Sequence, residues 1–226
     1  MAPTPATVEQ ITARLADLRQ RIDAARAPDQ AVAIVAVTKT FGPELVANAV
    51  AAGLTALGEN YAQELGAKAE ELRERFPDVA DRVRWHFIGG LQSNKIKMLG
   101  DLVDLWQTID RRSLVKELAK RQPGAGMLIQ VNTTDESQKS GCAPADVAAL
   151  VDDASQRGLD VRGLMTIGPT DGSDPRPAFD LLRRLGEEHG LIELSMGMSG
   201  DYEIAVRHGA TMVRIGSDLF GPRDRV

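Results

Sequence analysis

The sequence is short of the residues that build disulfides, metal sites and aromatic cores. It contains one cysteine, Cys142, and three histidines in 226 residues. A single cysteine cannot form an intramolecular disulfide, which favours a reducing compartment, so we expect a cytoplasmic protein. Aromatic residues make up only 4% of the chain. Aliphatic side chains must therefore fill the core, as is typical of helices packed on a parallel sheet.

Long apolar runs and a large excess of one charge are also missing. No apolar run approaches the roughly 20 residues that a membrane-spanning helix needs. The opening residues, MAPTPATVEQ, carry neither the basic nor the apolar region of a signal peptide. We therefore expect no membrane association. The 27 basic and 32 acidic residues leave a net charge of -5, which argues against nucleic acid as a partner.

What the sequence does contain is a regular alternation of strand and helix patterns. Apolar residues spaced by three and four predict an opening amphipathic helix from residue 8 that ends near Pro28. Short aliphatic runs predict eight strands, at 31–37, 55–57, 85–88, 103–107, 127–131, 161–165, 193–196 and 212–215. Helices are predicted between them, at 43–52, 61–76, 94–99, 111–121, 144–157, 177–189 and 201–208.

Eight strand–helix units close most naturally into one parallel α/β barrel, because their connections are right-handed βαβ units. We predict a single-domain (β/α)8 TIM-type barrel over residues 1–226, in which the opening helix replaces the one missing after strand eight. An open doubly wound sheet is the alternative. It has no glycine-rich fingerprint here, since Gly89-Gly90 is only a pair and no G-x-x-x-x-G-K-[ST] loop occurs.

In such a barrel the working residues lie beyond the C-terminal ends of the strands. Lys39 directly follows the first strand, where burial would lower the pKa of its amine and favour condensation with an aldehyde. From this residue alone, a solvated strand-end lysine is equally compatible. Ser199-Gly200 and Gly216-Ser217 follow the seventh and eighth strands and suit a phosphate held by backbone N–H groups and hydroxyls. Ordinary turn or capping chemistry is the alternative for each pair alone, but together with Lys39 they predict a phosphorylated aldehyde.

Other polar residues at the strand ends have plainer explanations. Arg214 stands in an apolar strand ending, so we expect it to point inward to a ligand rather than form a surface ion pair. Glu59 is expected to add a polar contact at the barrel mouth. His86 lies on an apolar strand and is more typical of a hydrogen-bonded core histidine than of a catalyst. His189 and His208 fall near predicted helix C-termini, so the histidines form no ligand cluster and we expect no metal.

Several motifs at these strand ends occur in an order that is typical of one family. They are Val37-Thr38-Lys39-Thr40, Gly58-Glu59-Asn60-Tyr61, His86-Phe87-Ile88-Gly89, Leu91-Gln92-Ser93-Asn94-Lys95, Gly163-Leu164-Met165, Leu194-Ser195-Met196-Gly197-Met198-Ser199 and Arg214-Ile215-Gly216. Nearly end to end, the chain resembles the pyridoxal phosphate homeostasis proteins. These are relatives of the alanine racemase N-terminal barrel, with fold type III of the pyridoxal-phosphate proteins.

The resemblance implies pyridoxal 5'-phosphate as the cofactor, held as a Schiff base on Lys39. The other implied cofactor-binding residues are Arg214 at the pyridine nitrogen, Ser199, Gly200, Gly216 and Ser217 at the phosphate, and Asn60 and Met165 as neighbours. An arginine beside the ring nitrogen disfavours its protonation and weakens the ring as an electron sink. That chemistry suits carriage or modest racemisation.

Two positions depart from the usual family pattern. Gly90 stands where a bulkier or cyclic residue is common, and Ser217-Asp218 replaces the usual threonine and small residue. Ser217 keeps the hydroxyl group. The carboxylate of Asp218 is unfavourable near a phosphate unless it points away.

The resemblance also bears on whether the protein is an enzyme. Family racemases add a β-rich domain that closes the site and brings a catalytic tyrosine from a partner subunit, whereas this sequence ends at Val226, just after strand eight. An open mouth works against carbanion chemistry, so we expect a monomeric, non-catalytic carrier that supplies pyridoxal phosphate to apo-enzymes. Two alternatives stay open. They are a pyridoxal-phosphate-dependent amino-acid racemase of low activity, with Lys39 and Tyr61 as acid and base, and a cofactor-free Schiff-base aldolase.

Overall fold

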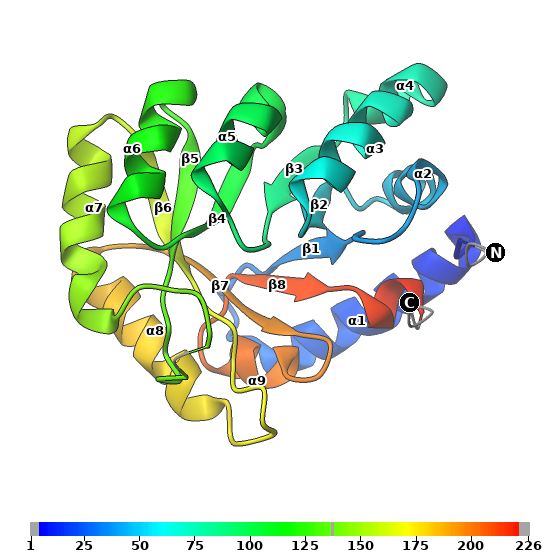
Figure 1. Ribbon diagram of the computed structural model, residues 1–226. Coiled ribbons are helices and arrows are strands. Elements are labelled where there is room, and N and C mark those ends of the chain that lie inside the picture. Colours follow the sequence, from blue (N-terminus) through cyan, green and yellow to red (C-terminus); the bar gives the residue numbers. More distant parts are fainter. Residues whose placement is uncertain (1–4, 137, 222–226) are drawn as a thin grey trace.

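Eight parallel strands form a closed barrel with the helices on its outside (Figure 1). The computed structural model describes residues 5–136 and 138–221, so both ends of the predicted domain, 1–4 and 222–226, lie outside the described residues. The strands follow one another around the barrel in sequence order, and the last pairs with the first. This closure confirms the predicted (β/α)8 barrel and excludes the open doubly wound sheet.

The elements have the following bounds. The strands are β1 Ala33–Val37, β2 Ala56–Glu59, β3 Arg84–Phe87, β4 Leu105–Ile109, β5 Gly126–Gln130, β6 Asp160–Met165, β7 Glu193–Met198 and β8 Met212–Ile215. The helices are α1 Val8–Ala25, α2 Pro43–Ala51, α3 Ala62–Arg75, α4 Pro77–Ala80, α5 Ser93–Leu99, α6 Arg112–Arg121, α7 Val147–Gln156, α8 Arg176–His189, α9 Tyr202–Arg207 and α10 Ser217–Phe220. Two 3-10 turns are η1 Gly100–Leu102 and η2 Pro144–Asp146.

Helix α1 begins at a capping box and buries one apolar face. The Thr7 hydroxyl accepts a hydrogen bond from the Gln10 amide, and the Gln10 side chain accepts one from the Thr7 amide, which satisfies two otherwise unpaired donors. The buried face is the one that the spacing predicts, namely Ile11, Leu15, Leu18 and Ile22. The helix packs against α2, α9 and α10. It therefore closes the outer ring between the first and last units, as predicted.

The structure differs from the sequence prediction at a few element bounds. Two single-turn helices, α4 and α10, were not predicted, because one turn is too short to show a helical period. Strand β4 begins two residues later than predicted, because a 3-10 turn that Val103 caps occupies the segment before it, and the buried side chain of Val103 resembles a strand position. Strand β2 extends to Glu59, a residue that is rare in strands. Its full burial is explained by its partners, which are described below.

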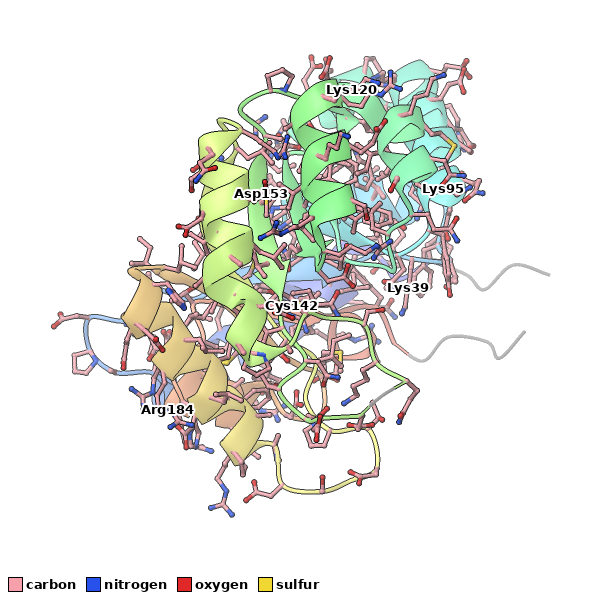
Figure 2. The ribbon with its side chains drawn as sticks, turned by 60° about the vertical axis from the view of Figure 1, so that its left-hand side comes forward. Lys39, Lys95, Lys120, Cys142, Asp153 and Arg184 are labelled. Carbon is pink, nitrogen blue, oxygen red and sulfur yellow. The ribbon has the colours of Figure 1, made fainter. Side chains whose placement is uncertain are left out.

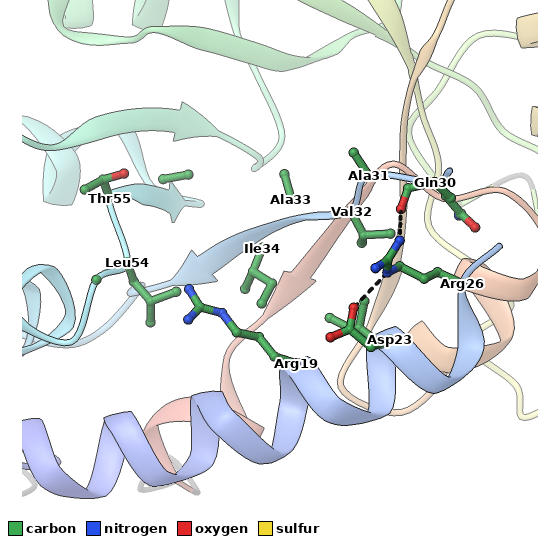
Figure 3. A pocket seen from close by; sticks show the side chains of 13 residues that line it. Arg19, Asp23, Arg26, Gln30, Ala31, Val32, Ala33, Ile34, Leu54 and Thr55 are labelled. Atoms are coloured by element: carbon green, nitrogen blue, oxygen red, sulfur yellow. Dashed lines mark hydrogen bonds and ion pairs between the residues drawn. The ribbon is translucent and has the colours of Figure 1, made fainter. Parts of the chain in front are cut away.

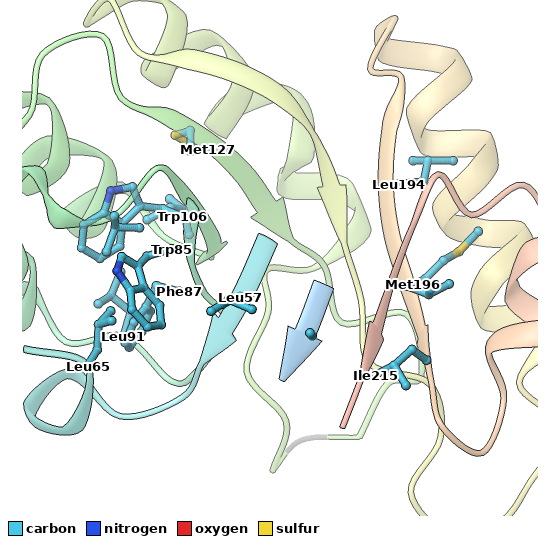
Figure 4. Packing of buried hydrophobic residues seen from close by; sticks show 14 of the residues in the cluster. Leu57, Leu65, Trp85, Phe87, Leu91, Trp106, Met127, Leu194, Met196 and Ile215 are labelled. Carbon is cyan, nitrogen blue, oxygen red and sulfur yellow. The ribbon is translucent and has the colours of Figure 1, made fainter. Parts of the chain in front are cut away.

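The core has two parts. A large cluster lies between the barrel and the helices and includes Trp85, Phe87 and Trp106 (Figure 4). A small cluster fills the barrel interior and consists of Val35, Leu105, Leu128, Met165 and Met212. Because side chains fill the interior of the barrel, the space for a ligand lies at its ends. Among the described helices, none is long and apolar enough to cross a bilayer.

Candidate functional site

A cavity of about 320 Å³ opens where the strands end at their carboxyl side. It is lined by Val37, Lys39, Asn60, Ile88, Ile167, Met198, Ser199, Gly200, Arg214, Gly216 and Ser217. Seven of the eight cofactor-binding residues predicted from the sequence are in this lining. They come from the ends of β1, β2, β7 and β8, which the closed barrel brings to one rim.

Met165 is the predicted residue that the cavity lining does not include. It is fully buried in the small interior cluster, and Ile167 packs against that cluster from above. Side chains two residues apart share a face of a strand, so Met165 and Ile167 point the same way at different depths. The structure thus puts Ile167 in the cavity wall and Met165 in the layer beneath it.

Lys39 lies just beyond β1, between two threonines with fixed backbones. The Thr38 amide donates to the carbonyl oxygen of Gly58 on β2, at 3.0 Å. Thr40 has a φ of 70°, a left-handed conformation that is uncommon for a β-branched residue. Figure 2 shows Lys39 at mid-height on the right of the view, below Lys120. Lys39 itself is half-buried and lines the cavity.

Arg214 points inward from β8, as predicted, and is only 4% exposed. Its Nη1 donates to the Ser195 hydroxyl and its Nη2 to the carbonyl oxygen of Thr166, both at 2.7 Å. Burial lowers the pKa of Arg214 to about 10, so it stays charged at neutral pH. Within the described part of the chain, no carboxylate forms an ion pair with it. The more distant carboxylate of Asp201 offsets part of the burial effect on the pKa of Arg214, and no carboxylate of the described residues occupies its hydrogen-bonding positions.

A hydrogen-bonded chain continues from Arg214 into the barrel. The Ser195 hydroxyl donates to Gln107 Oε1 at 2.7 Å, and Gln107 Nε2 lies 2.9 Å from His86 Nδ1. Burial, with a smaller effect of the Arg162 charge, lowers the pKa of His86 to about 4. The ring is thus neutral at pH 7, and its Nδ1 accepts from Gln107. His86 is the hydrogen-bonded core histidine that the sequence predicts.

The turn after β7 brings small residues and a hydroxyl to the cavity. Gly197 has a φ of 91°, and a Cβ there would lie 2.6 Å from the Ala205 side chain, so only glycine fits. A Cβ at Gly200 would meet nothing within 4 Å, which leaves room beside its backbone. Asp201 is used locally, because its Oδ1 accepts from the Met198 amide at 2.6 Å. This hydrogen bond fixes the Asp201 side chain within the turn, while Gly200 leaves space beside the backbone for an oxyanion.

The structure places the two positions that depart from the family pattern in different surroundings. Asp218 lines a shallow depression against α1, together with Arg14 and Arg21, and is not part of the cavity lining. Its Oδ1 also accepts a weak hydrogen bond from the Ser217 hydroxyl at 3.5 Å, so this carboxylate stays next to one of the predicted phosphate residues. A Cβ at Gly90 would meet no atom within 4 Å, so the position tolerates glycine as well as a larger residue.

Glu59 and Tyr61, two residues predicted at the barrel mouth, do not line the cavity. Glu59 was expected to add a polar contact there, and this is wrong. Its side chain is fully buried and bonds to Thr38 and Lys68, because Lys68 on α3 draws it behind the β1 loop. Tyr61, the acid/base candidate of the racemase alternative, is 55% exposed and does not line the cavity.

Further cavities flank the barrel. One of about 240 Å³ adjoins the first, shares Asn60, Ile88 and Ile167 with it, and reaches Lys139. Another, of about 600 Å³, lies at the opposite end, between α1 and the residues that lead into β1 and β2 (Figure 3). None of the predicted site residues lines the latter, and its Arg26 is paired with Asp23 at 2.7 Å.

The groups at the mouth fit a phosphorylated aldehyde with a ring nitrogen. The cavity brings together the amine of Lys39, the hydroxyls of Ser199 and Ser217 beside glycine backbone, and the buried guanidinium of Arg214, which forms no ion pair with a carboxylate of the described chain. Asn60 Oδ1 is buried and has no hydrogen-bond partner among the described residues, which leaves an acceptor for a ligand hydroxyl. A volume of about 320 Å³ is within the usual range of small-molecule sites, about 300 to 1,000 Å³.

Comparisons with known proteins identify relatives along nearly the whole chain. The alanine racemase N-terminal domain family matches residues 8–224. The pyridoxal phosphate homeostasis protein of Vibrio alginolyticus is 38% identical over 237 residues, which cover 99% of each chain. The structure of PipY from Synechococcus elongatus with PLP bound has a TM-score of 0.78 and 32% identity, covering 93% of this chain and 100% of that one.

A more distant structure shares the fold alone. Alanine racemase from Corynebacterium glutamicum has a TM-score of 0.73 at 16% identity, and the match covers 96% of this chain but 61% of the racemase. The full-length relatives, by contrast, match over nearly their whole length. The chain therefore belongs to the pyridoxal phosphate homeostasis protein family, within the larger family of the alanine racemase N-terminal domain.

Proposed function

We propose that the cavity at the barrel mouth binds pyridoxal 5'-phosphate as a Schiff base on Lys39, and that the protein carries and supplies this cofactor. The observation that carries the proposal is the shared cavity of about 320 Å³, which Lys39 lines together with the loops after β7 and β8. The names of the relatives and the PLP bound to PipY support it.

Each part of the cofactor has suitable groups in this chain. Ser199, Gly200, Gly216 and Ser217 would hold the phosphate through hydroxyls and backbone N–H groups. Arg214 would face the ring nitrogen, and its positive charge keeps that nitrogen unprotonated. Asn60 would bind beside the ring, with Ile167 and, beneath it, Met165 as apolar support. When bound, the cofactor supplies an electrophilic aldehyde and an electron-withdrawing ring.

The carrier role is favoured over catalysis by what surrounds Lys39. In the described lining, Lys39 and Arg214 are the titratable residues, and neither a carboxylate nor a histidine joins them. Racemisation needs a second acid/base group to reprotonate the substrate from the other side. Tyr61, at 55% exposure, is not held at the cavity. We therefore assign no catalytic residue and propose cofactor supply to apo-enzymes.

The remaining expectations belong to the same proposal. The barrel would function as one domain over residues 1–226 and as a monomer in the cytoplasm. Light scattering of the purified protein tests the monomer, and a mass of twice the chain would contradict it. Racemase activity of low rate stays the alternative, because alanine racemase shares the fold.

Borohydride trapping tests the attachment. Wild-type protein mixed with pyridoxal phosphate should develop a visible absorption band that borohydride abolishes, with the reduced adduct found on the peptide that contains Lys39. Lys39→Ala should give neither, while Lys97→Ala, at an exposed lysine of α5, should behave as wild type. A reducible chromophore in Lys39→Ala would overturn the proposal. Absence of the band in wild type would favour the aldolase, and turnover of alanine would favour the racemase.

A further inference from the structure

Behind Lys39 lies a buried group of charges that does not line the cofactor cavity. It consists of Glu59 at the end of β2 and Glu64 and Lys68 on α3, and is called the Lys68 cluster below. Lys68 is 4% exposed and Glu59 is 0% exposed. Lysine and glutamate are almost never fully buried unless they are paired, so their partners indicate what the cluster does.

The cluster holds the residue before Lys39. Lys68 Nζ donates to the carbonyl oxygen of Thr38 at 2.8 Å and to Glu59 Oε1 at 2.5 Å. The Thr38 hydroxyl donates to the same Glu59 oxygen at 2.7 Å. Thr38 is thus fixed through both its main chain and its side chain. Asn60, which lines the cavity, directly follows Glu59.

The cluster also holds the residue after Lys39. Glu64 Oε1 accepts a hydrogen bond from the Thr40 amide at 2.5 Å and another from Lys68 Nζ at 2.8 Å. Thr40 has a φ of 70°, and a strained backbone of this kind persists only where the surroundings hold it. One lysine side chain therefore connects to the backbone on both sides of Lys39.

Stability alone is a poor explanation for this arrangement. Taking the charges of Glu59 and Lys68 out of water is costly, and apolar residues of similar volume often stabilise a fold as well or better. Moreover, Glu59 Oε2 is buried without a hydrogen-bond partner among the described residues. The contacts that distinguish the cluster from an apolar replacement are those to Thr38 and Thr40.

We infer that Lys68 is a positioning residue, which with Glu59 and Glu64 fixes the backbone on either side of Lys39 and so holds the amine toward the cavity. The inference rests on the proposed attachment of pyridoxal phosphate to Lys39. It predicts that loosening the cluster weakens cofactor binding even where the fold is kept.

Two variants separate positioning from stabilisation. The double variant Lys68→Met/Glu59→Gln removes the buried ion pair and leaves only the Glu64 carboxylate, which is 26% exposed to solvent, without its lysine partner. The fold should therefore be kept, while the Thr38 carbonyl loses its donor. Glu64→Ala removes the acceptor of the Thr40 amide at a helical position that is partly exposed. Lys120→Met, at an exposed lysine on α6 (Figure 2), is the matched control.

The measurements are the thermal midpoint without cofactor and the Kd for pyridoxal phosphate from absorbance titration. We expect both cluster variants to keep a midpoint near that of wild type and to bind at least about tenfold more weakly, since each loses a charge-assisted contact that orders Lys39. The control should match wild type in both. Wild-type affinity in Glu64→Ala and in the double variant would overturn the inference.

Parallel trapping on Lys39→Ala separates this inference from the proposed function. If Lys39→Ala keeps the reducible chromophore, the attachment is wrong. If Lys39→Ala loses the chromophore and the cluster variants bind like wild type, the attachment stands and only the positioning role of Lys68 is wrong.

Discussion

Single polar residues inside the barrel determine what the cavity can bind. Arg214 is 4% exposed and is held by Ser195 and by the Thr166 carbonyl. Both hydrogen-bond partners are neutral, and the charge of Asp201 acts on the guanidinium without an ion-pair contact, so the buried charge is oriented but only partly compensated. Removing one partner of a buried charge is costly to a fold, and a cation left without a carboxylate favours a ligand with an acceptor atom. The arrangement fits a ring nitrogen better than a phosphate, which we place in the loops after β7 and β8 at Ser199 and Ser217.

His86 predicts how stability depends on pH. Its folded pKa is about 4, against about 6.5 in an unfolded chain. Between these values the unfolded chain binds the extra proton, so this residue makes the free energy of unfolding fall as pH drops from about 6.5 to about 4 and leaves it unchanged above 6.5. The full effect is on the order of 3 kcal/mol.

His86→Asn isolates this contribution, because the Asn amide oxygen can accept from Gln107 without titrating. Urea denaturation of the variant and of wild type across pH 4 to 7 should give curves that converge at neutral pH and separate below it. The carboxylates titrate in both proteins and cancel in the difference. Parallel curves over the whole range would contradict the lowered pKa.

At the scale of elements, the turn between β7 and α9 has two roles. It packs tightly against α9 at Gly197, and it lines the proposed phosphate position at Gly200. Gly197 has a φ of 91°, and a Cβ there would overlap Ala205, whereas a Cβ at Gly200 meets nothing within 4 Å. Gly197→Ala should therefore cost about 1 to 3 kcal/mol of unfolding free energy. Gly200→Ala should change it by less than about 0.5 kcal/mol but fill space that the phosphate would use.

Gly197→Ala and Gly200→Ala are compared with wild type in two measurements. Urea denaturation without cofactor gives the free energy of unfolding, and titration with pyridoxal phosphate gives the Kd. Both variants should bind more weakly, Gly197→Ala because its loop shifts and Gly200→Ala because its methyl group competes with the phosphate. Affinity equal to wild type in Gly200→Ala would mean that the phosphate does not approach this backbone.

The same element scale explains what the sequence could and could not predict. Strands that are covered on both sides appear in the sequence as short aliphatic runs, so the number and order of the strands could be predicted. The barrel follows from that order. So does the rim at the carboxyl ends of the strands, where Lys39, Arg214 and Ser199 come together. The single-turn helices α4 and α10 have no period to detect.

Contacts between distant positions were beyond the sequence. Lys68 pairs with Glu59, nine residues away, and Ser195 bonds to Gln107, 88 residues away. The sequence indicates that such a residue needs a partner only by placing a polar side chain in a buried strand, and it does not indicate which residue the partner is. For the same reason Glu59 was assigned to the mouth.

For the whole molecule, the cofactor would join both sides of the barrel's closing seam. Lys39 follows β1, Ser217 follows β8, and these two strands pair directly. A ligand that binds only the folded state adds about 2.7 kcal/mol at 100 times its Kd, which for a chain of this size raises Tm by roughly 5 to 10 °C. Differential scanning calorimetry should show this shift with pyridoxal phosphate, and a smaller one with inorganic phosphate. Lys39→Ala should keep only the smaller shift, since it loses the bond to β1. An equal shift in wild type and Lys39→Ala would mean that the stabilisation does not come from attachment at this seam.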